Sequence, residues 1–165
     1  MALPPCGIYR TTIALPGREE DVPAGRLVYF HNHSEQGPPI VLLPRSNTWN
    51  RWTFNERGLL VEGEAAALFI ATLTSLPEEG LYIVQRPIGS GESVLRPRTL
   101  VQVGYNPSGH VILFSAEPRD NGLSFPERGK RFEGLKVFDS LARASFDAPN
   151  GRQDTVEHPD PPTIH

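Results

Sequence analysis

One stretch of the chain occurs twice, and this repeat limits the possible folds more than any other feature. Residues 50–63, Asn-Arg-Trp-Thr-Phe-Asn-Glu-Arg-Gly-Leu-Leu-Val-Glu-Gly, return 71 positions later as residues 121–134, Asn-Gly-Leu-Ser-Phe-Pro-Glu-Arg-Gly-Lys-Arg-Phe-Glu-Gly, with seven of fourteen positions identical. Such self-similarity is typical of a chain built from two related units. A feature present in both units is expected to serve the fold, and a feature present in one unit is the better candidate for function.

The repeat continues on the amino-terminal side of this stretch. Three apolar segments match: Gly7-Ile-Tyr9 with Gly80-Leu-Tyr82 and Leu27-Val28 with Leu100-Val101 at an offset of 73, and residues 40–43 with 111–114 at an offset of 71. The change of offset lies within residues 31–38 of the first unit and residues 104–109 of the second. Both segments have the composition of hairpin turns. The units therefore span about residues 6–76 and 79–146.

Within each unit, short apolar runs rich in Val, Ile, Tyr and Phe are bounded by Gly, Pro, Asn or Ser, which is typical of antiparallel strands. We predict strands near residues 7–14, 25–32, 39–44, 50–55 and 58–62, and again near 80–86, 98–104, 110–116, 122–126 and 130–133.

Each unit then changes to helical spacing of its apolar residues. The predicted helical faces consist of Ala65, Leu68, Phe69, Thr72, Leu73 and Leu76 in the first unit and of Phe138, Leu141, Ala142, Ser145 and Phe146 in the second. The first helix is rich in alanine on nearly all sides, so we expect it in the middle of the fold between the units. The predicted fold is mainly antiparallel β (α+β): two tandem ββββ(β)α repeats fused into one pseudo-twofold sandwich or barrel-like domain, residues 1–146, with two short helices and a Pro-rich tail, residues 147–165.

Size and composition favour a soluble cytoplasmic protein with one core. A unit of about 70 residues is marginal on its own, and the mean hydropathy of the 165-residue chain is −0.32. The chain has no signal-peptide pattern and no apolar run of about 20 residues, so we expect no membrane span. A net charge of −3 gives no reason to expect nucleic-acid binding. Cys6 is the single cysteine, so we expect no disulfide, no cysteine-based zinc site, and a small buried side chain.

The repeated motif Phe-x-Glu-Arg-Gly-x-x-x-Glu-Gly is expected to be structural. Phe54 and Phe125 would face inward, and Gly58 and its counterpart Gly129 would supply a positive φ. The alternative is a pair of equivalent sites for an anion or a peptide carboxylate, built on Arg57 and Arg128.

The first unit alone contains His31-Asn-His33-Ser-Glu35. On a strand these three side chains share one face, as a site with two histidines and one carboxylate requires. Gly25 followed by five residues and His31-x-His33 resembles the opening of the first cupin motif, which implies a small metal-dependent enzyme with a divalent metal. The resemblance covers about nine residues, and the sequence then departs from the cupin pattern. Glu35 comes earlier after His33 than the cupin glutamate does. His110 directly follows Pro-Ser-Gly, whereas the later cupin histidine comes after two further residues. The metal ligands under this interpretation are His31 and His33 with either Glu35 or His110, and the alternative is a polar loop bonded to its own backbone.

A second difference between the units is Trp49-Asn-Arg51-Trp52, where the second unit has Asp120-Asn-Gly-Leu123. Trp52 replaces an apolar residue and is expected in the core. Trp49 replaces an aspartate and is expected to be exposed, and an exposed Trp beside an Arg is typical of a binding hot spot. The candidate binding residues are Tyr29, His31, His33, Glu35, Trp49 and Arg51, and the alternative for Trp49 is a lid on the core.

The sequence contains no complete catalytic constellation, such as a Gly-x-Ser-x-Gly elbow or a cysteine with a neighbouring histidine. It therefore favours a non-catalytic module without a cofactor, such as an inhibitor, an immunity-type protein or an accessory protein. This module would bind a protein or peptide partner through the loop 31–38 and Trp49. The alternatives are the metal-dependent enzyme and a protein that self-assembles through its sheet edges, for example as a homodimer.

Overall fold

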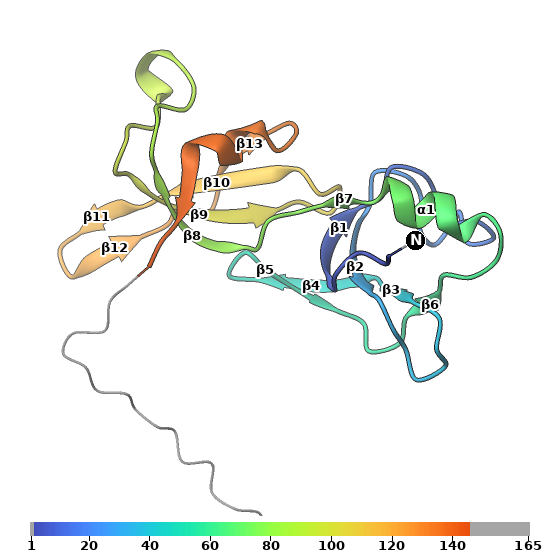
Figure 1. Ribbon diagram of the computed structural model, residues 1–165. Helices are drawn as coiled ribbons and strands as arrows, with labels where there is room; N and C mark the ends of the chain where they lie inside the picture. The colour runs from blue at the N-terminus through green and yellow to red at the C-terminus, as the bar shows by residue number, and fades with distance from the viewer. Residues whose placement is uncertain (1, 146–165) are drawn as a thin grey trace, which may run out of the picture.

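The computed structural model describes residues 2–145, and the predicted Pro-rich tail lies outside these residues. The described chain is mainly antiparallel β, with two five-stranded sheets, two two-stranded hairpins and one α-helix (Figure 1). Every predicted strand overlaps a strand of the structure, although most are shorter than predicted.

The first sheet comes from the amino-terminal part of the chain. Its strands have the order β6-β3-β2-β1-β7. They are β1 (Gly7–Arg10), β2 (Leu27–His31), β3 (Ile40–Leu42), β6 (Leu59–Leu60) and β7 (Thr74–Ser75). In the pairing of β1 with β2, Gly7 lies opposite Phe30. This pairing brings Cys6 to the end of β2.

The second sheet has the order β13-β10-β9-β8-β14, so the four strands that match by the repeat occupy the same places in both sheets, and β14 takes the edge position that β7 has in the first. Its strands are β8 (Gly80–Val84), β9 (Leu100–Tyr105), β10 (Val111–Ser115), β13 (Lys130–Phe132) and β14 (Leu141–Arg143). In both sheets the outer strands pair with only one neighbour, so the sheets of the described residues form no closed barrel, and the predicted pseudo-twofold sandwich stays a prediction.

In the chain, a two-stranded hairpin follows β3 of the first sheet and another follows β10 of the second. β4 (Pro44–Thr48) pairs with β5 (Arg51–Phe54), and β11 (Glu117–Arg119) pairs with β12 (Gly122–Ser124). β4 and β11 were not predicted, because they are composed mainly of polar residues and Pro and lack the apolar alternation of a half-buried strand.

The helical predictions are partly wrong. The first helix exists as α1 (Ala66–Thr72), but it buries Ala66, Phe69 and Ile70, whereas Leu68 is exposed. The predicted second helix is replaced by a 3₁₀ helix (Lys136–Ser140) and the strand β14, which pairs with β8. A further 3₁₀ helix covers Gly91–Ser93. None of the described helices combines the length and the apolar character needed to cross a membrane.

Each sheet has its own hydrophobic cluster. The first contains α1 residues together with Tyr9, Phe30 and Val41, so α1 packs within the first unit and does not lie between the units as predicted. The second cluster also receives side chains from the first unit, namely Ile8, Leu27, Trp52 and Leu76. These shared side chains join the two sheets, and the single domain over residues 1–146 stays a prediction.

Gly58 and Gly129 are needed for packing rather than for a positive φ, which neither adopts. A Cβ at Gly58 would lie 2.9 Å from side-chain atoms of Ile40 and Leu42 in β3. A Cβ at Gly129 would lie 2.5 Å from Cγ2 of Ile112 and 2.7 Å from the Leu113 carbonyl oxygen in β10. The repeated glycine thus lets the chain pass close over β3 in the first sheet and over β10 in the second.

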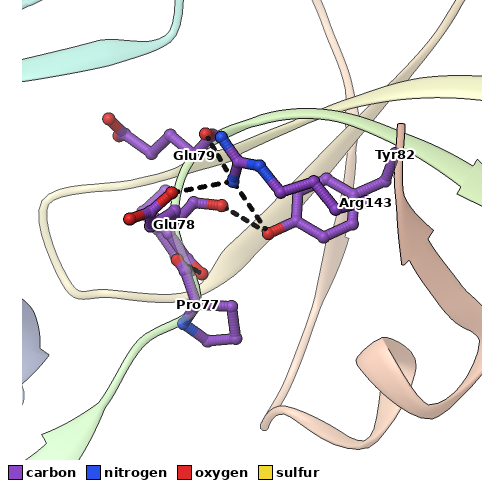
Figure 2. A network of polar contacts seen from close by, with 6 residues as sticks. Pro77, Glu78, Glu79, Tyr82 and Arg143 are labelled. Atoms are coloured by element: carbon purple, nitrogen blue, oxygen red, sulfur yellow. Dashed lines mark hydrogen bonds and ion pairs between the residues drawn. The ribbon is translucent and has the colours of Figure 1, made fainter. Parts of the chain in front are cut away.

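Residues 76–79 link the first sheet to the second, and we call them the link. Two tyrosines and an arginine hold this link in place (Figure 2). The Tyr82 hydroxyl donates to the Glu78 carbonyl oxygen at 2.7 Å, and the Tyr105 hydroxyl donates to the Pro77 carbonyl oxygen at 2.6 Å. Arg143 of β14 lies 3.1 Å from the Glu78 carboxylate and donates to the Glu79 carbonyl oxygen at 3.4 Å. These contacts fix the backbone of the link against β8, β9 and β14.

Candidate functional site

The hairpin β4–β5 ends in a turn with an unusual residue. Trp49 and Asn50 form the two-residue turn, with φ values of 55° and 61°. Two positive φ values are what a type I′ turn requires, and Asn, Asp and Gly are the residues that adopt them at least cost. A bulky side chain in this region of φ is a genuine outlier, so Trp49 occupies a position that the fold alone would fill with another residue.

The backbone of this turn is bonded to the second sheet. The Gln102 side chain donates to the Trp49 carbonyl oxygen at 2.8 Å and accepts from the Asn50 side chain at 3.0 Å. The Trp52 indole N–H donates to the Tyr105 carbonyl oxygen at 2.8 Å. Figure 1 shows the turn reaching the region of β8 and β9. The hairpin is therefore a bridge between the sheets, and its tip is held in one orientation.

The Trp49 side chain takes no part in this bridge. It is 87% exposed, whereas Trp52 is partly buried against the second hydrophobic cluster. The expected exposure of Trp49 is confirmed, and Trp52 packs against the core without being fully buried in it. The result is an exposed indole on a backbone that is fixed by neighbouring residues.

The remaining candidate binding residues do not join Trp49 in one pocket. Tyr29 and Arg51 line a cavity of about 570 Å³ together with residues of the link between the sheets. His31, His33 and Glu35 line a second cavity of about 800 Å³, beside β3 and Gly58. Trp49 lines neither, so the predicted surface consists of separate parts.

The predicted metal ligands are also divided. His31 and His33 form a group with Cys6, in which one ligand atom from each residue lies within 4.8 Å of the others, and neither Glu35 nor His110 belongs to this group. His110 follows the turn after β9, where its Nδ1 lies 3.3 Å from the Asn106 amide nitrogen.

Cys6 was predicted to be a buried side chain without a site role. This prediction is wrong, because Cys6 is exposed. The antiparallel pairing of β1 with β2 places Cys6 beside His31 and Asn32. That pairing was the available signal, because the strands near residues 7–14 and 25–32 were both predicted.

A buried carboxyl group was missed as well. Glu79 is only 8% exposed, and its Oε2 accepts a hydrogen bond from the Trp52 backbone N–H at 3.2 Å. Its Oε1 is buried without a hydrogen-bond partner in the described structure. Burial raises the pKa of Glu79, against the opposing effects of the Trp52 hydrogen bond and the Arg51 charge. No sequence pattern distinguished Glu79 from the exposed Glu78 beside it.

Known proteins add nothing to this description, because no family model, curated protein or solved structure matches the chain. The arguments for function therefore depend on the geometry of the chain itself.

Proposed function

We propose that this protein is a non-catalytic module that binds a protein or peptide partner, with Trp49 as the central contact. The observation that carries the proposal is an indole side chain that is 87% exposed in a turn position with a φ of 55°. Backbone strain of this kind tends to occur where function requires a particular residue. Tryptophan is also among the residues most enriched at the energetic centres of protein interfaces.

The frame around Trp49 supports this role. Its carbonyl oxygen and the following Asn50 are both bonded to Gln102, so the backbone is ordered before any partner arrives. A preorganised contact loses less conformational entropy on binding than a mobile one. The exposed Arg45 and Arg51 are the charged residues of the same hairpin. The partner chemistry that fits is an apolar pocket for the indole with acidic groups at its rim.

We further propose that the two sheets descend from one duplicated unit and that the first unit acquired the binding residue. The shared strand order and the shared glycine contact with the third strand support the duplication. In the second hairpin, Asp120 occupies the place of Trp49 and has no positive φ. The indole is therefore a feature of one unit, as expected for a residue added for binding.

The experiment is affinity purification from the source cells, followed by measurement of the affinity for each enriched protein. Trp49→Ala should weaken binding by about 2 kcal/mol, roughly 30-fold. Its thermal midpoint should stay within a few degrees of the wild-type value, because the side chain packs little. Leu68→Ala and Leu123→Ala are matched controls, since both leucines are exposed, and they should leave binding unchanged. Equal enrichment of the same proteins by Trp49→Ala would refute the proposal.

A further inference from the structure

Cys6, His31 and His33 come together at the open end of the β1–β2 pair. One ligand atom from each residue lies within 4.8 Å of the other two, and Cys6 and His33 are exposed. The rings of His31 and His33 have centroids 4.4 Å apart in an edge arrangement. Thiolate and imidazole are the ligands that zinc takes in proteins, whereas magnesium and calcium require oxygen ligands.

Hydrogen bonds orient both imidazoles and select the same tautomer in each. Nδ1 of His31 is bonded to the His33 carbonyl oxygen, and Nδ1 of His33 lies 2.6 Å from the Asn32 side-chain oxygen. Both oxygens only accept, so in the neutral form of each ring the proton lies on Nδ1 and the lone pair lies on Nε2. A bond from the second ring nitrogen to a carbonyl oxygen is the usual support of a metal-binding histidine.

The sulfur of Cys6 is supported by the same residue. The Asn32 backbone N–H points to Sγ at 3.4 Å, and Sγ lies 3.3 Å from the Asn32 side-chain oxygen. Asn32 thus contacts both Cys6 and His33, and it holds two of the three potential ligands in place.

We propose that Cys6, His31 and His33 bind one zinc ion, with water as the fourth ligand. Zn–S and Zn–N bonds in a tetrahedral site would place the ligand atoms roughly 3.3–3.6 Å apart, so the three ligand atoms need to approach one another by at most about 1.5 Å. On binding, the Cys6 thiol releases its proton to solvent and the S–Zn bond forms. His31 and His33 also line the cavity of about 800 Å³, so the fourth position is accessible to water or a small ligand. The proposal does not depend on the role of Trp49.

The counterparts of these residues in the second unit support the assignment to one unit alone. At the offset of 73, Cys6 corresponds to Glu79 and His31 to Gly104. In the second unit this place is covered by the β4–β5 hairpin, through the bond from Trp52 to Glu79 and the contact of Asn50 with Gly104. In the first unit the place is left accessible and carries the three ligand-type side chains.

The test uses the full chain without a histidine tag, titrated with Zn²⁺ against a chelator and separately with Co²⁺. The wild type should bind one ion per chain, and the Co²⁺ form should show thiolate-to-cobalt charge-transfer absorption. Cys6→Ser should abolish that absorption. Asn32→Ala should weaken zinc binding by about 10- to 100-fold, and Cys6→Ser and His33→Ala should weaken it further.

The control is the triple variant His110→Ala, His158→Ala, His165→Ala, which removes every histidine outside the group. It should bind zinc as the wild type does. A wild-type cobalt spectrum without the charge-transfer absorption would overturn the proposal, and so would loss of zinc binding in the triple variant. The wild-type spectrum decides the question even if a substituted protein does not fold.

Discussion

The two hairpins β4–β5 and β11–β12 occupy the same place in the order of strands but have different roles. The first reaches the second sheet, where Trp52 bonds to Tyr105 and packs against the second hydrophobic cluster. The second projects away from the rest of the molecule on the side opposite α1 (Figure 1), and Leu123, the counterpart of Trp52, is 59% exposed. One hairpin is thus part of the junction between the sheets, and the other is a surface element.

The difference separates structure from function within the first hairpin. Trp52, Asn50 and Gln102 account for the attachment of the hairpin to the second sheet. Trp49 adds nothing to that attachment through its side chain, and its backbone conformation is one that a bulky residue adopts at a cost. The junction explains why the hairpin exists, but it does not explain why its turn contains tryptophan.

The largest difference in stability is expected between two truncations at corresponding positions, Trp52→Ala and Leu123→Ala. Trp52→Ala should lower the free energy of unfolding by about 3 kcal/mol, because it removes a packed indole and leaves the Tyr105 carbonyl oxygen without its donor. Leu123→Ala should change it by less than about 0.5 kcal/mol, as is usual at exposed sites. Denaturant unfolding of both variants measures the difference. Equal losses would contradict the distinction between the hairpins.

A smaller effect concerns Glu79, which accepts the Trp52 backbone N–H. Its pKa in the folded protein is raised above its ordinary value of 4.5, so the folded state binds more protons than the unfolded state between these two values. The contribution of Glu79 to stability is therefore greatest at low pH and is lost as the pH rises through the folded pKa. Glu79→Gln removes this dependence.

The measurement is the free energy of unfolding of Glu79→Gln minus that of the wild type, from pH 4 to pH 8. The difference should increase with pH, by about 1.4 kcal/mol for each unit by which the pKa is raised. Glu78→Gln is the control, because the Glu78 side chain is 84% exposed. A difference that stays constant with pH, or that increases equally for Glu78→Gln, would show that Glu79 is not held in a desolvated site.

A modest change in stability, in the favourable direction, is expected from Trp49→Asn. Asparagine tolerates positive φ, so the substitution should relieve the cost of the turn and stabilise the protein by about 1 kcal/mol, or roughly 3 °C in thermal midpoint. Trp49→Ala keeps a Cβ and gains no such tolerance, so it serves as the reference. A thermal midpoint for Trp49→Asn below that of Trp49→Ala would contradict the assigned cost of positive φ, and midpoints of both variants well below that of the wild type would mean that the indole contributes to the fold.

Most strands could be predicted because they carry short apolar runs that recur in the second unit, whereas the polar strands β4 and β11 carry no such run. The second helix could not, because Phe138, Leu141 and Ala142 have helical spacing, but Phe138 lies in a 3₁₀ turn against Tyr82 and the others lie in β14. Tertiary pairing with β8 replaced the local preference. The exposure of Trp49 was predictable from its exchange with Asp120. Cys6 and Glu79 depended on strand register and on burial, which composition does not encode.

The most direct test of the central claim combines stability and binding in a single comparison of Trp49→Asn with the wild type. The account predicts a thermal midpoint that is equal or higher together with a partner affinity that is lower by about 30-fold, corresponding to about 2 kcal/mol. Such opposite changes are expected only if the tryptophan is present for the partner and not for the fold. Unchanged affinity, or an affinity that falls in proportion to a lowered midpoint, would contradict the claim.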